Sequence, residues 1–183
     1  MRKSNKDAAQ TRQAIVATAA DHIRRTGLAE TSLADVMAAA GLTHGGFYKH
    51  FRNKEQLVAE ALAAAGEKVI DAVGRTMTNG GLDAAIDTYL SAAHRDAETP
   101  LCPFAALGSE MARSSEEARI AAADVLNRLL TLLTPGADND DPRSEAIVAL
   151  STMVGAMTLA RIVPDKVLSA EIIDRTKDHL RRH

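Results

Sequence analysis

The stretch of sequence that decides the fold is GLTHGGFYKHFRNKEQL, which runs from Gly41 to Leu57. Two adjacent glycines, Gly45 and Gly46, precede a Phe-Tyr-Lys-His-Phe run, although both flanks are rich in Ala and Leu and are typical of helices. A glycine weakens a helix interior by about 0.8–1.0 kcal/mol relative to Ala. We therefore expect the glycines to serve a purpose that offsets this loss, such as the removal of side-chain bulk beside a binding partner.

The residues before this stretch predict two helices. Apolar residues recur at helical spacing within residues 7–25, and Gly27 follows as a stop signal. Ser32, with Asp35 three residues later, forms a start that is similar to a capping box, and Gly41 is a natural end for this second, short helix.

A third helix is predicted from a cap at Thr43 to about Phe51, which makes the pair a helix-turn-helix. In this motif the second helix enters the major groove of DNA, so its exposed residues are small, basic or able to hydrogen-bond. Phe47 and Phe51, four residues apart, are expected to pack inside and to leave the polar residues between them outside. Asn53 then caps a further helix, where Lys54 is placed to contact a second phosphate.

Composition limits the classes of protein to which the chain can belong. It has 183 residues, enough for one domain or two small ones, of which 46 % are hydrophobic and 25 % charged. Its single cysteine, Cys102, cannot form an internal disulfide, which favours a reducing, cytoplasmic location. The polar start and the lack of an unbroken apolar run of about 18 residues predict a protein that is not in a membrane.

Charge is divided unevenly along the chain. Residues 1–60 contain nine Lys/Arg and six Asp/Glu, a balance of +3, and the remainder carries −5. Because a basic surface attracts phosphate and an acidic one repels it, the N-terminal part is the candidate for binding nucleic acid. Arg2, Lys3 and Lys6 add cations that are placed to follow the DNA backbone or a minor groove as an arm.

The rest of the chain is also predicted to be helical, because β-branched residues rarely alternate with polar ones. Gly66 and Gly74, inside the fourth helix, are interpreted as close-packing points or tolerated exceptions. TNGGLD is a predicted break and TPGADNDDPR a predicted loop, and Pro164 separates the last two helices. The helices expected after Asn53 cover about 54–77, 82–97, 103–114, 116–133, 143–162 and 165–180.

Thr31–Leu57 resembles the signature of the TetR family of bacterial transcriptional regulators. Met37 departs from the pattern, since the family usually has a small residue there. The matching positions are Val36, Ala40, Gly41, Leu42, Thr43, Gly45, Tyr48, His50, Phe51, Lys54 and Leu57.

The resemblance implies an all-α fold in two parts. Residues 1–53 would form an N-terminal three-helix helix-turn-helix DNA-binding domain, and residues 54–183 a larger helical domain for ligand binding and dimerisation. The implied partners are double-stranded operator DNA, a small-molecule effector and a second copy of the chain. The implied function is repression at a quasi-palindromic operator that ligand relieves. The candidate DNA-binding residues are Ser32, Thr43, His44, Gly45, Gly46, Tyr48, Lys49, His50 and Lys54.

The helix expected over 143–162 carries an apolar seam that a partner helix could contact. The same seam could belong to the core of one subunit, and both interpretations stay open. Its members at helical spacing are Ile147, Leu150, Val154, Met157 and Arg161, and the small residues that would allow close approach are Ala149, Gly155 and Ala156.

Cys102 precedes Pro103, so a helix that starts there would lower the pKa of the thiol and suit an electrophile or redox sensor. The alternative is a buried cysteine in a core or pocket wall. The candidate ligand-pocket residues are His94, Cys102, Phe104, Met111, Met153 and Met157.

Motifs of enzymes are missing from the sequence, which has no phosphate-binding loop, Gly-x-Ser-x-Gly or His-Glu-x-x-His. We therefore assign no catalytic residue, metal site or cofactor. A helical protein-interaction module would account for the apolar helices, but not for the basic, glycine-containing third helix.

Overall fold

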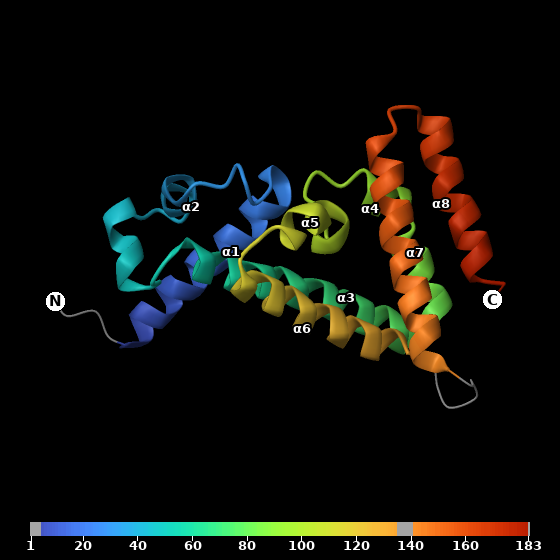
Figure 1. Ribbon diagram of the computed structural model, residues 1–183, viewed down its shortest axis with the longest axis horizontal. Helices are drawn as coiled ribbons and strands as arrows, with labels where there is room; N and C mark the ends of the chain where they lie inside the picture. The colour runs from blue at the N-terminus through green and yellow to red at the C-terminus, as the bar shows by residue number, and fades with distance from the viewer. Residues whose placement is uncertain (1–4, 135–140, 183) are drawn as a thin grey trace.

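The computed structural model describes residues 5–134 and 141–182, and every regular element in these ranges is a helix. Figure 1 shows a small N-terminal unit at one end, a long pair formed by α3 and α6, and the α7–α8 hairpin at the other end. The elements are α1 (Asn5–Thr26), α2 (Leu33–Ala39), the 3₁₀ helix η1 (His44–Lys49), α3 (Lys54–Tyr89), α4 (Ala92–Arg95), α5 (Pro103–Ala112), α6 (Glu116–Leu133), α7 (Pro142–Ile162) and α8 (Lys166–Leu180).

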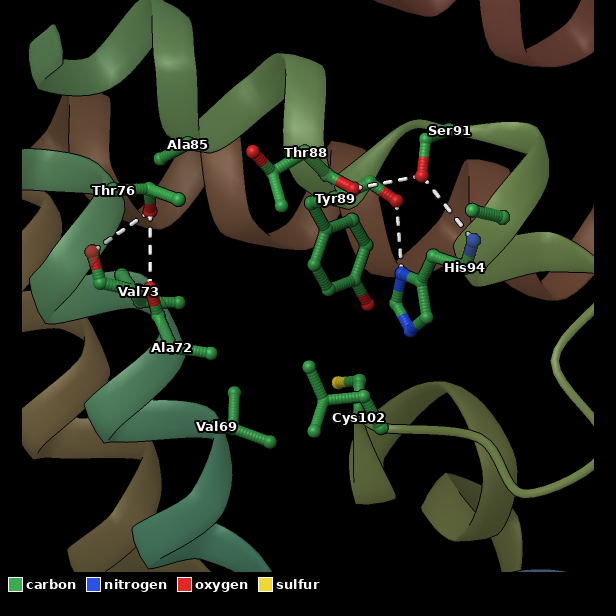
Figure 2. Close-up of a pocket in the computed structure, with 12 residues that line it drawn as sticks. Val69, Ala72, Val73, Thr76, Ala85, Thr88, Tyr89, Ser91, His94 and Cys102 are labelled. Atoms are coloured by element: carbon green, nitrogen blue, oxygen red, sulfur yellow. Dashed lines mark hydrogen bonds between the residues drawn. The ribbon is translucent and has the colours of Figure 1, made fainter. Parts of the chain in front are cut away.

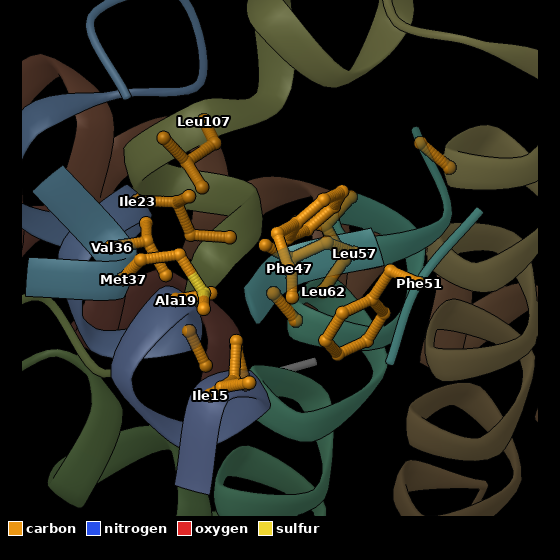
Figure 3. Packing of buried hydrophobic residues seen from close by; sticks show 14 of the residues in the cluster. Ile15, Ala19, Ile23, Val36, Met37, Phe47, Phe51, Leu57, Leu62 and Leu107 are labelled. Carbon is orange, nitrogen blue, oxygen red and sulfur yellow. The ribbon is translucent and has the colours of Figure 1, made fainter. Parts of the chain in front are cut away.

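The N-terminal unit packs α1, α2 and η1 around one apolar core, to which the start of α3 and α5 also contribute. The predicted capping of α2 is confirmed, because Ser32 Oγ accepts the Asp35 N–H at 3.1 Å. Gly41, with φ of 71°, takes the left-handed conformation that ends this helix. Figure 3 shows the core, whose members include Ile15, Ala19, Ile23, Val36, Met37, Phe47, Phe51, Leu57, Leu62 and Leu107.

The third helix differs from its prediction, since η1 is a 3₁₀ helix that ends at Lys49 rather than an α-helix that runs to about Phe51. Its hydrogen bonds span three residues: Gly46 N–H donates to Thr43 O, and His50 N–H to Phe47 O, both at 2.9 Å. Thr43 is the N-cap but makes no capping bond with its side chain. Two glycines and a weak cap favour the short 3₁₀ form over a longer α-helix.

The predicted break at TNGGLD is confirmed inside α3, which consists of two helical segments that meet at residues with non-helical backbone angles. Gly80 and Gly81 kink it, and Gly81 has a positive φ of 65°. The helix expected over 82–97 ends instead at Tyr89. Ser91 then caps the short α4, where its Oγ accepts the His94 N–H at 3.2 Å.

The two glycines inside α3 have different surroundings. A Cβ on Gly66 would lie 2.6 Å from Val125 Cγ1 on α6 and closer still to Cγ2, whereas a Cβ on Gly74 would meet open space. Gly66 is therefore the close-packing point where α3 and α6 meet, and Gly74 is a tolerated exception.

The last two helices and the Pro164 break between them are confirmed, while the predicted loop TPGADNDDPR lies mostly outside the described residues. By length and composition α7 could cross a membrane. This was not predicted from the sequence, because polar residues interrupt the apolar run in α7. One such helix is weak evidence for a membrane span, because core helices of soluble proteins can have the same length and composition; in this protein 39 % of the stretch is buried.

The seam predicted on α7 is divided between the core and the surface. Half of its members pack inside the subunit, where they face α5, α6 and α8: Ala149, Leu150, Ala156 and Met157. Val154 and Arg161 are half-buried, and Ile147 and Gly155 are exposed. The two exposed members belong to a longer exposed stripe that follows α7 and the start of α8. We call it the outer stripe, and it consists of Ile147, Val148, Ser151, Gly155, Leu159, Ile162, Val167 and Leu168.

Candidate DNA-binding face and effector cavity

The helix-turn-helix presents a polar face that its two phenylalanines hold in place. Phe47 and Phe51 are buried, with ring centroids 5.4 Å apart, while Tyr48 between them is 66 % exposed. Of the predicted DNA-binding residues, those exposed are Ser32, Thr43, His44, Gly45, Tyr48 and Lys49, whereas Gly46, His50 and Lys54 are half-buried. The Ser32 hydroxyl is already engaged, since it donates to Asp35 Oδ2 at 2.6 Å.

Neither glycine of η1 is required by the fold itself. Both lie outside the left-handed region, which among the glycines in residues 5–134 and 141–182 is reached only by Gly27, Gly41 and Gly81. A Cβ on Gly45 would meet nothing within 4 Å, and one on Gly46 would make only an ordinary contact, 3.7 Å from Met37 Cε. The free protein therefore has room for alanine at both positions.

Arg12 fixes the end of η1 against α3, a role that the sequence did not reveal. Its Nε donates to the His50 carbonyl at 3.2 Å, and its guanidinium pairs with Glu60 and lies 4.6 Å from the centre of the Phe51 ring. Because the partners are 38 and 48 residues away, no local pattern links them.

Cations border the polar face at the start of α3. Asn53 caps this helix as predicted, with Oδ1 accepting the Gln56 N–H at 2.9 Å, and Lys54 is its first residue. Arg52, which the sequence analysis did not single out, is exposed beside them, 3.5 Å from Glu117. Lys6 is exposed on α1, while Arg2 and Lys3 of the predicted arm lie outside the described residues.

A cavity of about 300 Å³ lies between α3, α4 and the start of α5. It is mainly apolar, and none of its lining residues carries a formal charge. Figure 2 shows Tyr89 and His94 side by side at one corner, with Cys102 below them. The lining consists of Val69, Ala72, Val73, Thr76, Ala85, Thr88, Tyr89, Ser91, Ala93, His94, Leu101 and Cys102.

Two buried polar atoms at this corner have no hydrogen-bond partner among the described residues: Tyr89 Oη and His94 Nε2. The two rings meet edge to face, with centroids 4.6 Å apart, and His94 Nδ1 lies 2.8 Å from the Tyr89 carbonyl oxygen. Burial lowers the pKa of His94 below its usual 6.5 and, together with the nearby Arg161, outweighs the opposing effect of the bond to the Tyr89 carbonyl, so the neutral imidazole predominates at pH 7. Burial also raises the pKa of the Tyr89 hydroxyl well above its usual value, and the neighbouring Cys102 thiol adds to this effect.

Cys102 is the N-cap of α5, as the sequence predicts, but it is only 1 % exposed. Burial raises the pKa of its thiol and outweighs the opposing effects of Tyr89 and of the first N–H groups of α5. A thiol with a raised pKa carries little thiolate at neutral pH and is a poor nucleophile.

The cavity lining includes only two of the predicted pocket residues, His94 and Cys102. Met111 packs in the N-terminal core, and Met153 and Met157 in the core beneath α7. Phe104 lies between these two cores. Methionines at helical spacing fill the core here, as they often do. The described residues hold no group of His, Cys, Asp or Glu suited to a metal ion.

Helix α5 connects the cavity wall to the helix-turn-helix. It begins beside Cys102, and farther along it the Glu110 carboxylate accepts the N–H groups of Leu28 at 2.7 Å and Ala29 at 3.0 Å. These two residues form the turn between α1 and α2. A second link is made by the buried Arg24 of α1, whose Nη1 donates to the Pro100 carbonyl at 2.9 Å.

Comparisons with known proteins agree on one family. A model described as bacterial regulatory proteins, tetR family, matches residues 15–61, and one described as the C-terminal domain of LmrA/YxaF-like transcriptional regulators matches residues 79–167. An HTH-type transcriptional regulator of Mycobacterium tuberculosis is 32 % identical over 168 residues, which cover 84 % of this chain and 86 % of that protein.

Two further proteins are similar in sequence or in structure. The probable acrEF/envCD operon repressor of Escherichia coli is 37 % identical over 59 residues, which cover 32 % of this chain and 27 % of that protein. The crystal structure of a TetR transcriptional regulator from Chloroflexus aurantiacus is 28 % identical, with a TM-score of 0.76 and coverage of 96 % of this chain and 94 % of that one.

Proposed function

Because this chain belongs to the TetR family of bacterial transcriptional regulators, we propose that it is a repressor that releases its operator when a small molecule fills the cavity. The proposal that the protein represses transcription is supported by the E. coli relative, which is a probable operon repressor. The similarity to that protein covers about a third of this chain. The partners would be operator DNA, a second copy of the chain and a small-molecule effector. Such a regulator acts in the cytoplasm, where the DNA is.

We propose that η1 enters the major groove. Residues on η1 and its cap would contact base edges, and the start of α3 would contact a phosphate. Thr43, His44, Tyr48 and Lys49 are exposed on η1 and its cap, where hydrogen-bonding side chains reach base edges. Lys54, at the N-terminus of α3, would hold a phosphate with the help of the helix dipole. In a two-fold dimer the two recognition helices would read half-sites about 34–36 Å apart or a multiple of that distance.

The outer stripe of α7 and α8 supports the proposed homodimer. Six large apolar side chains are exposed along it, and Gly155 at its centre leaves open space where a partner helix could approach. Leu159→Arg should therefore give a monomer by light scattering and weaken operator binding. A variant that remains dimeric would place the interface elsewhere.

The observation that supports the proposed regulation is that α5 connects the cavity to the helix-turn-helix. Cys102, the N-cap of this helix, lines the cavity, and Glu110 near its other end binds the turn between α1 and α2. A ligand that moves α5 would move this turn and change the position of the helix-turn-helix. The coupling is then a difference in DNA affinity between two arrangements of one rigid helix.

The test is fluorescence anisotropy with labelled DNA from upstream of the regulator's own gene, in low salt and then with excess random DNA. We expect specific binding that a cavity ligand weakens. Glu110→Ala should bind DNA but respond less to the ligand, whereas Asp124→Ala, which removes an exposed acid on α6, should respond like the wild type. Failure to bind any DNA at low salt would exclude the proposed function.

The alternative function, a thiol-based sensor of electrophiles or oxidants, gains no support from the surroundings of Cys102. The thiol is buried and its pKa is raised, which is the opposite of a reactive cysteine. We expect N-ethylmaleimide to leave operator binding unchanged in the wild type and in Cys102→Ser alike. Loss of binding in the wild type alone would restore the sensor hypothesis.

A further inference from the structure

We infer that the cavity binds a neutral, mainly apolar molecule that carries a hydroxyl group, and that this hydroxyl bonds to both His94 and Tyr89. This ligand class rests on the proposed function in one respect, since it takes the cavity to be the effector site. Three features of the cavity define the class: the nature of its wall, the tautomer of His94 and the unpartnered hydroxyl of Tyr89.

The wall selects for a small and uncharged ligand. A cavity of about 300 Å³ is at the lower end of the range for ligand sites, and one of ~150 Å³ is enough for a benzene molecule. The space therefore suits a ligand of about two rings. None of the lining residues offers a charge to compensate an ionised group, and burying an uncompensated charge is costly.

The hydrogen bond on the far side of the ring fixes the tautomer of His94. Its Nδ1 lies 2.8 Å from the Tyr89 carbonyl oxygen, and a carbonyl can only accept, so Nδ1 carries the proton. Since the imidazole is neutral, Nε2 has a free lone pair and can only accept. This acceptor is buried and has no partner among the described residues, so it calls for a ligand that donates an O–H or N–H.

Tyr89 supplies the complementary group at the same corner. Its hydroxyl can donate, and Figure 2 shows that it and the distal edge of the His94 ring point the same way, toward Cys102. A ligand hydroxyl can give its proton to His94 Nε2 and accept the proton of Tyr89 at one oxygen atom. A ketone or an ether could satisfy Tyr89 alone, so the pair discriminates in favour of a hydroxyl. Because both protein atoms are covered, the ligand reaches them only when a side chain at this corner moves aside.

Two other hydroxyl groups in the wall, those of Thr76 and Ser91, are already engaged. The Thr76 hydroxyl donates to the Val73 carbonyl at 2.8 Å, and the Ser91 hydroxyl donates to the Thr88 carbonyl and accepts the His94 N–H. The selectivity therefore falls on His94 and Tyr89, and Thr76 provides a matched control position.

The test compares four probes with the full-length protein: 2-naphthol, 2-methoxynaphthalene, naphthalene and 2-naphthoate. The chain has no tryptophan, so naphthyl emission can be followed without an indole background. We expect 2-naphthol to bind about tenfold or more tightly than either neutral analogue, since only it satisfies both buried atoms, and naphthoate to bind more weakly than naphthol.

Substitutions in the cavity test which residues cause the preference for 2-naphthol. His94→Phe and the conservative Tyr89→Phe should each reduce the naphthol preference to about threefold or less, whereas Thr76→Val should retain it. Circular dichroism checks that each variant is folded. Equal binding of naphthol and its methyl ether, tighter binding of naphthoate, no binding of naphthol, or a preference that survives both ring substitutions would overturn the inference.

Failure of the inference can be told apart from failure of the proposed function. The probe titration needs no DNA, and the anisotropy assay measures operator binding separately. If naphthol binds with the expected preference and operator affinity does not change, the ligand class stands and the proposed release of DNA by this ligand fails. If operator DNA is bound and naphthol is not, the ligand class fails while DNA binding stands.

Discussion

Gly45→Ala should stabilise the protein and damage its function at the same time. In the free protein the new methyl group meets open space and the backbone φ is not positive, so alanine fits without strain. Replacing glycine at such a position stabilises by about 0.4–1 kcal/mol, because the unfolded chain loses conformational freedom. At 2–4 °C per kcal/mol for a chain of this size, the melting temperature should rise by roughly 1–4 °C.

The same methyl group should weaken operator binding if Gly45 lets the backbone approach DNA. Crowding a close-packed contact costs about 1–3 kcal/mol, which corresponds to a roughly 5- to 150-fold weaker affinity. Thermal melts and operator anisotropy measure the two effects. Gly74→Ala is the control, since this position also has open space but lies in the middle of α3; it should gain similar stability and bind DNA normally. A Gly45→Ala variant with unchanged affinity would refute the close approach of Gly45 to DNA.

Three further outcomes follow from the described contacts. Gly66→Ala should cost about 2 kcal/mol in urea unfolding, because overpacking against both Val125 methyl groups outweighs the gain in helix propensity; adding Val125→Ala should recover most of the loss, and an unaltered single variant would contradict the close packing. Lys54→Ala should weaken binding to all DNA sequences and reduce the salt slope by about one, whereas a changed sequence preference would argue against a phosphate contact. The lowered pKa of His94 means that the unfolded chain takes up a proton that the folded chain refuses, so stability should fall as the pH drops below about 6.5 and level off below the lowered pKa; urea titrations of His94→Gln should lack this component, and equal pH profiles would disprove it.

Local patterns were enough to predict two capped helix starts, whereas the predicted cap at Thr43 makes no side-chain bond. Ser32 and Asn53 cap their helices as predicted, because a cap is decided by residues within three positions of each other. The same reasoning predicted a longer, α-helical third helix in place of η1. The balance between α and 3₁₀ geometry also depends on how Phe47, Phe51 and Arg12 pack. The predicted break at Gly80 and Gly81 is confirmed, because both residues have non-helical backbone angles and the helix resumes after them as expected.

The cavity could be predicted only in part. His94 and Cys102 were chosen for their chemistry, and both line it, but Tyr89 was not chosen although it completes the polar corner. The predicted methionines pack in the two cores instead. Spacing along a helix shows which residues share a face, but not whether that face meets a core or a cavity.

The sequence by itself determined an all-helical chain, its DNA-binding motif and the family to which it belongs, because caps, glycine stops and apolar periodicity act within a few residues of each other. Only the tertiary structure decided the cavity, the link from Glu110 to Leu28 and Ala29, and the face of α7 that remains exposed. These features join residues that are far apart in the chain, such as the 82 positions between Glu110 and Leu28. Their geometry depends on the kink in α3, on the contact at Gly66 and on the packing of whole helices, which no local pattern specifies.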